Sequence, residues 1–118
     1  MALYEDLYVD QGADARWRLR LLNADASYRD LANTTVRGKI NRSYGADSSE
    51  AVSFDARVIS PSSDGIIDII LSNTQTDSLS RRRYVYDVEI EYTDPDSGLP
   101  YVERILEGKL IVSKSVTK

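Results

Sequence analysis

The fold of this chain is decided by one alternating stretch, Tyr84-Val85-Tyr86-Asp87-Val88-Glu89-Ile90-Glu91-Tyr92. Apolar residues occupy every second position, which places them on one side of a β-strand and their neighbours on the other. A strand of this kind has one buried and one solvated face, so it belongs to a half-buried sheet. Because the same alternation recurs along most of the sequence, we predict an all-β domain with little room for a catalytic apparatus.

Several other segments show the same pattern and are separated by turn signals. Residues 60–65 and 94–98 are rich in proline, glycine, serine and aspartate, the residues that form tight turns. Residues 72–79 interrupt the alternation, and we expect a short helical turn there, anchored by Leu79, that carries the chain from one sheet to the other. The predicted strands span residues 3–9, 15–22, 34–42, 52–58, 66–71, 83–92 and 101–113.

No amphipathic helix separates these segments, which favours antiparallel sheets over an α/β fold. We therefore predict one domain over residues 1–118, an immunoglobulin-like antiparallel β-sandwich of about seven strands. A small closed barrel is the structural alternative. Either Tyr84 or Tyr86, which follow the predicted crossing, is expected to serve as the tyrosine corner of the sandwich.

The early strand over residues 15–22 separates its side chains clearly. Its odd positions, which include Trp17 and Leu19, are apolar, whereas Arg16, Arg18 and Arg20 share the other face. This pattern predicts a strand with one dry and one wet side. We expect the segments 3–9 and 15–22 to pair as neighbours.

Two inner positions can also be predicted from local sequence. The segment 66–71 places Ile67, Ile69 and Leu71 inside and Asp68 outside. Gly38, in the middle of a strand, predicts a bulge or the close approach of another part of the chain, with Trp17 as the expected neighbour.

The amino-acid composition argues against most classes of enzyme. The 118 residues include no cysteine and no histidine, so disulfides, thiolate metal sites and the commonest general base are all missing. Carboxylate-only catalysis requires two acids in a dry cleft with separated pKa values, and it leaves a hydrolase as the enzymatic alternative. We expect a non-enzymatic protein without a cofactor or a metal.

Charge and hydropathy limit the classes of partner that we expect for this chain. The chain has 15 basic and 19 acidic residues and a net charge of −4, which disfavours nucleic-acid binding. No run approaches the length of about 18 apolar residues typical of a membrane span, and residues 1–6 lack the basic start of a signal peptide. We expect a protein that binds neither nucleic acid nor membrane and is used without passing a secretion channel. The ends, 1–6 and 113–118, are expected to become ordered only on assembly.

Two arginine clusters are candidate contact sites. Arg81, Arg82 and Arg83 either face solvent at a turn, the interpretation we favour, or grip an acidic partner or a phosphate. The arginines at positions 16, 18 and 20 either form only the wet side of a strand or lie against an acidic neighbour.

Tyrosine is the dominant aromatic residue, with eight tyrosines against one phenylalanine. Its side chain suits positions that are buried at one end and wet at the other, which include interfaces. The candidate interface residues are Tyr4, Tyr8, Arg16, Arg18, Arg20, Tyr44, Arg81, Arg82, Arg83 and Tyr101.

A calcium site is the alternative interpretation of the acids near residues 94–98. Asp94 and Asp96, together with Asp87, offer the oxygen ligands that calcium prefers. Their spacing lacks the glycine and the distal glutamate of a calcium-binding loop with helical flanks, so we favour a turn.

Local signatures along nearly the whole chain support a family resemblance. They lie at residues 7–14, 30–31, 64–67, 71–72, 76, 79, 83–90, 104–112 and 116–117. In this order they resemble small virion proteins of contractile-tailed phages, particularly those that infect cyanobacteria. Each signature is a strand or a turn rather than a chemical motif.

The resemblance implies an immunoglobulin-like module of the baseplate or the tail periphery, comparable to the N-terminal module of baseplate upper proteins, which anchor receptor-binding fibres. Those proteins continue into a long C-terminal region, whereas this chain ends at Lys118, so we expect a stand-alone adaptor. The implied partners are other virion proteins of the tail, baseplate or fibre, bound in multiple copies in a symmetric assembly. The implied location is the virion, assembled in the host cytoplasm.

Other functions fit the same all-β build. A capsid-decoration protein or a head-to-tail neck protein would differ from a baseplate adaptor only in its position in the particle. A carbohydrate-binding module would use aromatic side chains as platforms for sugar rings.

Overall fold

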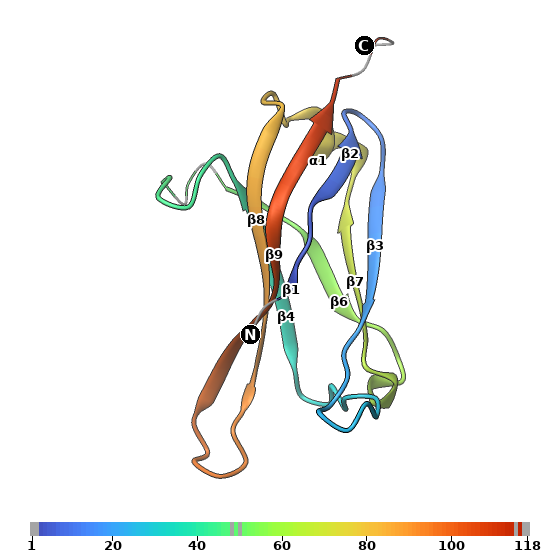
Figure 1. Cartoon of the computed structure of the whole chain (residues 1–118), viewed down its shortest axis with the longest axis vertical. Helices are drawn as coiled ribbons and strands as arrows, with labels where there is room; N and C mark the ends of the chain where they lie inside the picture. The colour runs from blue at the N-terminus through green and yellow to red at the C-terminus, as the bar shows by residue number, and fades with distance from the viewer. Residues whose placement is uncertain (1–2, 48, 50, 115, 117–118) are drawn as a thin grey trace.

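In the computed structural model, which describes residues 3–47, 49, 51–114 and 116, the chain forms two β-sheets that pack face to face (Figure 1). The predicted all-β sandwich is confirmed, because the sheets stay separate instead of closing into a barrel. Thr117, part of a resembling stretch, lies outside the described residues. The elements are β1 (Leu3–Tyr4), β2 (Leu7–Asp10), β3 (Ala15–Arg20), β4 (Thr35–Asn41), β5 (Val52–Ser53), β6 (Asp55–Val58), η2 (Ser62–Asp64), β7 (Ile66–Leu71), α1 (Asn73–Asp77), β8 (Arg83–Thr93) and β9 (Pro100–Ser113).

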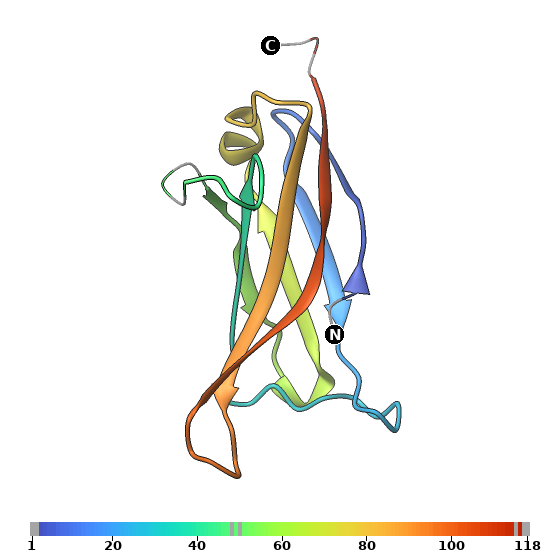
Figure 2. The same cartoon turned by 60° about the vertical axis from the view of Figure 1, so that its left-hand side comes forward.

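The two sheets differ in size. The large sheet has the order β1-β9-β8-β4-β5, with β2 also paired to β9, and the small sheet has the order β3-β7-β6. Described strand pairs are antiparallel except that β1 and β2 run parallel to β9, so the large sheet is mixed. The order β3-β7-β6 facing β9-β8-β4 is that of an immunoglobulin-like sandwich. Figure 2 shows the two layers from a second side.

The expected pairing of the first two segments is wrong. Leu7 pairs with Leu110 of β9 in the large sheet, whereas Trp17 pairs with Ile69 of β7 in the small sheet. The turn between them crosses the end of the sandwich and is held there by α1. The backbone N–H of Gly12 donates to the Thr76 hydroxyl at 3.0 Å, and that hydroxyl donates to the Ala13 carbonyl at 2.8 Å.

The predicted helical turn and crossing over residues 72–79 are confirmed. The Ser72 hydroxyl accepts from the Gln75 backbone, and the Gln75 side chain accepts from the Ser72 backbone, which forms a capping box at the start of α1. Leu79 is buried after the helix, and the Tyr84 hydroxyl accepts from the Arg81 backbone N–H at 3.0 Å. Tyr84 therefore fastens the corner that the sequence assigned to either Tyr84 or Tyr86.

The core lies between the sheets and contains the alternating apolar positions. Ile67, Ile69 and Leu71 of β7 are buried as predicted, and they face Tyr86, Val88 and Ile90 of β8. Leu106, Leu110 and Val112 of β9 complete the centre. These inner side chains are therefore removed from water, which is the main source of stability in such a domain.

The chain changes sheets at Phe54, between β5 and β6. Its backbone N–H donates to the Gly38 carbonyl at 2.9 Å, and its ring meets Trp17 and Tyr86 edge to face, each with centroids 6.1 Å apart. A Cβ atom on Gly38 would lie 2.9 Å from the Phe54 ring. The predicted close approach at Gly38 exists, but Phe54 makes it rather than Trp17, which packs on the far side of Phe54.

The ends of the chain are described only in part. Leu3 and Tyr4 pair with Leu106 and Glu107 of β9, so this part of the N-terminal segment has a partner strand within its own chain. At the other end, β9 extends to Ser113. Residues 1–2, 115 and 117–118 lie outside the described residues.

The strands β8 and β9 form a long hairpin that projects beyond the rest of the sandwich (Figure 1). Val88 pairs with Leu106 but Glu89 pairs with Arg104, so Ile105 is an extra residue, a β-bulge. Beyond the bulge, the inner positions of β9 are Glu103 and Tyr101 instead of aliphatic residues. Where the hairpin extends past the core, its inner side therefore carries polar and aromatic side chains.

Candidate interaction surfaces

Four arginines lie on the outer side of the small sheet, and we call this surface the arginine face. Arg16, Arg18 and Arg20 come from alternate positions of β3, as predicted, and Arg57 comes from β6. Arg18 and Arg57 both pair in register with Asp68 of the central strand β7. The sheet thus places one carboxylate in the middle of the arginines.

Asp68 faces outward as predicted, but it is not a solvated residue, because it is only 2% exposed. The Arg18 Nε lies 2.7 Å from Oδ1 and its Nη2 lies 3.0 Å from Oδ2, a two-pronged ion pair. The Arg18 hydrogen bond holds the pKa of the Asp68 carboxyl below its ordinary value. The arginine stripe therefore covers Asp68 and shields it from water.

The arginine face carries more positive than negative charge. Its aspartates are Asp68 and Asp55, and Asp55 pairs with Arg57 at 2.6 Å. The Arg20 guanidinium lies 4.1 Å from the ring centroid of Tyr28, a cation–π contact. Half-buried Ile66 and Ile70 of β7 pair in register with Arg20 and Arg16. The result is a cationic surface with apolar patches on a chain whose net charge is −4.

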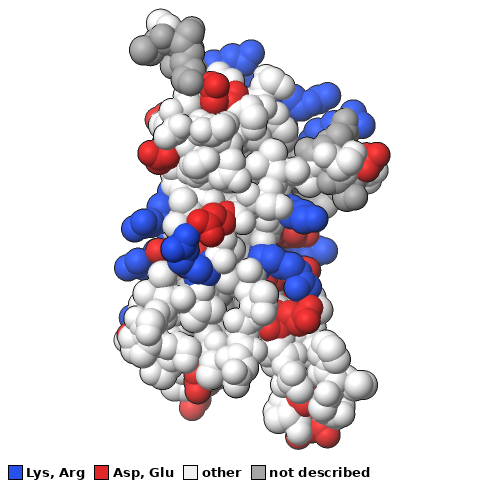
Figure 3. Space-filling view, turned by 180° about the vertical axis from the view of Figure 1, so that it is seen from behind, with Lys and Arg blue, Asp and Glu red and all other residues white. Residues whose placement is uncertain are grey.

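On the outer side of the large sheet, basic side chains pair with acidic ones. Arg37 contacts Glu89 at 2.6 Å and Glu91 at 3.0 Å. Arg104 lies 3.5 Å from Asp87 and 3.8 Å from Glu107. Figure 3 shows basic and acidic residues interleaved across the middle of the molecule, seen from behind. The arrangement satisfies most of these charges within the chain.

The four tyrosines predicted as interface residues do not form one surface. Tyr4 and Tyr8 pair in register with Glu107 and Ile111, so they lie on the outer side of the large sheet. Tyr44 follows β4, and Glu107 beside it is one reason that its pKa is raised, after burial. Tyr101 lies on the projecting hairpin. Tyr4 and Tyr44 both lie near Glu107.

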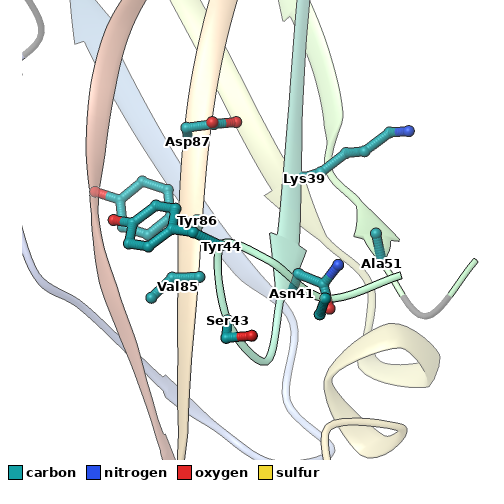
Figure 4. Close-up of a pocket in the computed structure, with 9 residues that line it drawn as sticks. Lys39, Asn41, Ser43, Tyr44, Ala51, Val85, Tyr86 and Asp87 are labelled. Atoms are coloured by element: carbon teal, nitrogen blue, oxygen red, sulfur yellow. The ribbon is translucent and has the colours of Figure 1, made fainter. Parts of the chain in front are cut away.

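A small pocket of about 230 Å³ lies on the large sheet beneath the loop that follows β4 (Figure 4). Lys39 of β4, Val85 and Asp87 of β8, and Tyr44 of the loop line it. Burial raises the pKa of the Asp87 carboxyl, against the opposing effect of Arg104. Asp87 is the one carboxylate in the described lining, whereas hydrolysis by carboxylates alone uses two.

The cluster Arg81, Arg82 and Arg83 lies at the start of β8 and is exposed, which fits both a solvated turn and a contact with an acidic partner. Arg82 also lines a groove of about 460 Å³ with Ile111, Val112, Ser113 and Lys114 of the β9 end. The backbone N–H of Val112 donates to the Arg82 carbonyl at 2.7 Å, which ties the two walls of the groove together.

A second groove, of about 560 Å³, lies at the opposite end, between the β3–β4 connection and β8. Its lining includes Asn23, Asp30, Asn33, Thr34 and Tyr92. It is bordered by a contact cluster that we call the clasp, in which Arg29 pairs with Glu103 at 3.2 Å, and the Tyr92 hydroxyl donates to Glu103 at 3.3 Å. The clasp joins the β3–β4 connection to the hairpin.

The acids near residues 94–98 form a turn. The Asp94 carboxylate accepts from the Asp96 backbone N–H at 3.1 Å and from the Ser97 hydroxyl at 3.0 Å. Asp87 lies in the middle of β8 and pairs with Arg104 instead. Within the described ranges, no cluster of acidic residues is arranged to hold a metal ion. No helix in the described part of the chain is long and apolar enough to span a membrane.

Comparisons with protein-family models and with curated proteins found no match. Among the surfaces described above, the arginine face combines a surplus of basic over acidic residues with half-buried Ile66 and Ile70.

Sequence reasoning missed three residues that shape these surfaces: Arg57, Arg29 and Glu103. The signal for Arg57 was present, because it alternates with Asp55 on a predicted strand. Arg29 lies in an irregular connection, and Glu103 reaches the inner side only because of the bulge at Ile105. A strict period of two across Ile105 would have placed Glu103 on the outer side.

Proposed function

We propose that this protein is a non-enzymatic structural module of a phage virion, a baseplate or tail adaptor that docks onto neighbouring tail or fibre proteins through the arginine face. The observation that carries the proposal is the surplus of arginine on the outer side of the small sheet of an acidic chain. The resemblance of the strand and turn signatures to small virion proteins of contractile-tailed phages supports the setting.

The composition of the arginine face suits a protein partner. Arginine is enriched in protein interfaces, and half-buried Ile66 and Ile70 supply apolar area between the charged groups. Arg18 is already held by Asp68, so less side-chain entropy is lost when a partner binds. A partner with an acidic surface would meet Arg16, whose side chain is 64% exposed. Such a complex would assemble faster at low salt.

Localisation in the particle tests the proposal. Particles purified from an infected culture would be labelled with gold-coupled antibodies against this chain and viewed by electron microscopy. Label at the baseplate or along the tail supports the adaptor function. Label on the capsid or at the neck would replace it with the capsid-decoration or head-to-tail alternative, and absence of the chain from purified particles would contradict a virion role.

Charge removal then tests the surface. The double variant Arg16→Gln with Arg57→Gln keeps the Arg18–Asp68 pair and removes two exposed cations without placing a carboxylate beside Asp68. We expect it to melt close to the wild type, because exposed ion pairs contribute little, but to be lost from purified particles. Lys39→Gln, on the large sheet, is the matched control and should be incorporated normally. Equal incorporation of the double variant would show that the arginine face is not the docking surface.

A carbohydrate-binding module is the second candidate. The groove lined by Asn23, Asn33, Asp30 and Tyr92 combines amides, a carboxylate and an aromatic ring, the groups that bind sugars. A glycan array probed with the labelled chain tests this candidate, and binding that is lost in Asn33→Ala would support it. Silence across the array would count against it and leave the adaptor proposal untouched.

A further inference from the structure

The two ends of the long axis differ in their charged residues. The molecule measures 50 Å along this axis. Exposed Arg82 and Lys114 lie at one end, where Asp10 also pairs in register with Ser113, whereas Asp94 and Asp96 lie at the turn of the projecting hairpin at the other (Figure 1). In Figure 3 the end of the hairpin shows acidic residues and no basic ones. One copy of the chain therefore offers charges at each end that complement the opposite end of another copy.

The acidic end is a hydrogen-bonded turn, which we call the tip and define as residues 94–99. The backbone N–H of Asp94 donates to the Leu99 carbonyl at 2.9 Å, and that of Gly98 donates to the Asp94 carbonyl at 2.8 Å. Asp94 also accepts two bonds through its side chain. These bonds close the turn and leave Leu99 65% exposed beside the exposed Asp96. An exposed leucine on a fixed turn loses little entropy when it is buried by a partner.

The basic end is a groove, which we call the end groove. It has a volume of about 460 Å³ and is lined by Arg82, Ile111, Val112, Ser113 and Lys114. Ile111 is half-buried and supplies the apolar area between the two cations, whereas Val112 belongs to the core. Its combination of apolar wall and positive rim matches the combination of leucine and aspartate at the tip.

We propose that the tip of one copy docks in the end groove of the next copy, with Leu99 against Ile111 and Asp96 near Arg82 and Lys114. The contact joins two different surfaces, so each copy keeps one free tip and one free groove, and repetition produces open chains of copies or closed rings. It uses neither the arginine face nor a second kind of protein. Self-association in this manner therefore goes beyond the adaptor function and does not depend on it.

The purified full chain tests the proposal by sedimentation equilibrium. Between about 10 µM and about 1 mM chain at low salt, the average mass should rise above the 13.3 kDa of one copy. At about 0.5 M salt, screening of the charge pairs should lower that mass again. A mass that stays at 13.3 kDa over the whole concentration range would overturn the proposal.

Two variants identify the surfaces. The tip variant is Asp96→Asn with Leu99→Ser, and the groove variant is Arg82→Glu with Lys114→Glu. The tip variant alone and the groove variant alone should each remain a monomer at concentrations where the wild type associates. The melting temperature of each should equal that of the wild type. Lys109→Glu, an exposed position away from both ends, is the control and should associate like the wild type.

A mixture of the two variants gives the sharpest result. The tip variant keeps an intact groove, and the groove variant keeps an intact tip, so an equal mixture should form pairs and nothing larger. Association of either variant alone to the wild-type extent would contradict the proposal. A mixture that stays at the mass of one copy would contradict it as well.

Discussion

The strands β8 and β9 run through two environments. In the half of the hairpin that packs on the small sheet, Val88 and Leu106 are at most 2% exposed. In the projecting half, Leu99, Tyr101 and Val102 are between 49% and 65% exposed. The same pair of strands is a core element at one end and a free surface at the other.

This difference shows what a period of two does and does not specify. The alternation assigns side chains to one side of a strand, but it does not say whether another layer covers that side. In the packed half, β7 covers the inner side, and β4 and the N-terminal strands flank the edges. In the projecting half, the clasp of Arg29, Tyr92 and Glu103 marks the place where that cover ends.

The largest effect is expected in the packed half. Leu106→Ala removes a fully enclosed side chain opposite Val88 and should lower the free energy of unfolding by about 4 kcal/mol, on the scale of buried leucine truncations. Urea denaturation followed by tryptophan fluorescence measures it. A loss of less than about 1 kcal/mol would mean that the packed half is not a tight core.

The edge of the packed half gives the next prediction. A Cβ on Gly108 would lie 2.0 Å from the Glu5 carbonyl oxygen, which also accepts the hydrogen bond of the Tyr86 hydroxyl. Gly108→Ala should therefore push the N-terminal strand away from β9, at a cost of about 2 kcal/mol, typical of overpacking. Hydrogen exchange should speed up at residues 5–10.

The matched control is Gly45→Ala, because a Cβ at Gly45 meets nothing within 4 Å. Its stability and its hydrogen exchange should match the wild type. If Gly108→Ala exchanges no faster than Gly45→Ala at residues 5–10, the N-terminal strand does not depend on the close approach at Gly108.

Most of the packed half could be predicted from the sequence, because each inner position is apolar and each turn has its own signal. The strands over residues 34–42, 66–71 and 83–92, and the crossing anchored by Leu79, appear close to their predicted bounds. The partner of the N-terminal segment was not predictable. The alternation of Leu7 and Val9 does not say which strand pairs with them, and in the structure they pair with Leu110 and Val112 of β9.

The surfaces were less predictable than the core. The arginine stripe of β3 follows directly from alternation, but the burial of Asp68 depends on arginines from two strands that are distant in sequence. The projecting hairpin depends on the bulge at Ile105, which has no proline or glycine signal. Exposure of Leu99 and pairing of Glu103 follow from that bulge and from the length of the small sheet, neither of which local sequence reveals.

At the boundary between the two halves, the clasp should contribute modestly. Glu103→Gln weakens its pair with Arg29 and should lower the free energy of unfolding by about 1 kcal/mol at neutral pH, as for partly exposed ion pairs. Comparison of wild-type and variant urea curves measures the difference. Arg57→Gln, which removes a more exposed pair, should cost less and serves as the control.

The difference in stability between the wild type and Glu103→Gln should depend on pH. The hydrogen bond from Arg29 holds the pKa of the Glu103 carboxyl below its ordinary value. The contribution is therefore complete above the pKa of an unfolded glutamate, about 4.3, and is lost as the pH falls through the lower folded value. Wild type and Glu103→Gln should converge in stability as the pH falls below that range. A gap that stays constant down to the acid transition would rule out this ion pair as its source.

The smallest effect on stability is expected at the tip. Leucine-to-alanine substitutions at the tip and in the core compare the two halves of the hairpin directly. Leu99→Ala removes a side chain that is 65% exposed, so the free energy of unfolding should change by less than about 0.5 kcal/mol. Thermal and urea unfolding measure this, with Leu106→Ala in parallel. A loss near that of Leu106→Ala would mean that Leu99 is covered within one copy, and the two halves of the hairpin would not differ. A neutral result, combined with weaker self-association in sedimentation, would instead assign Leu99 to contacts between copies. The turn at Asp94 would then fix the shape of the tip, and a second copy would cover the exposed leucine.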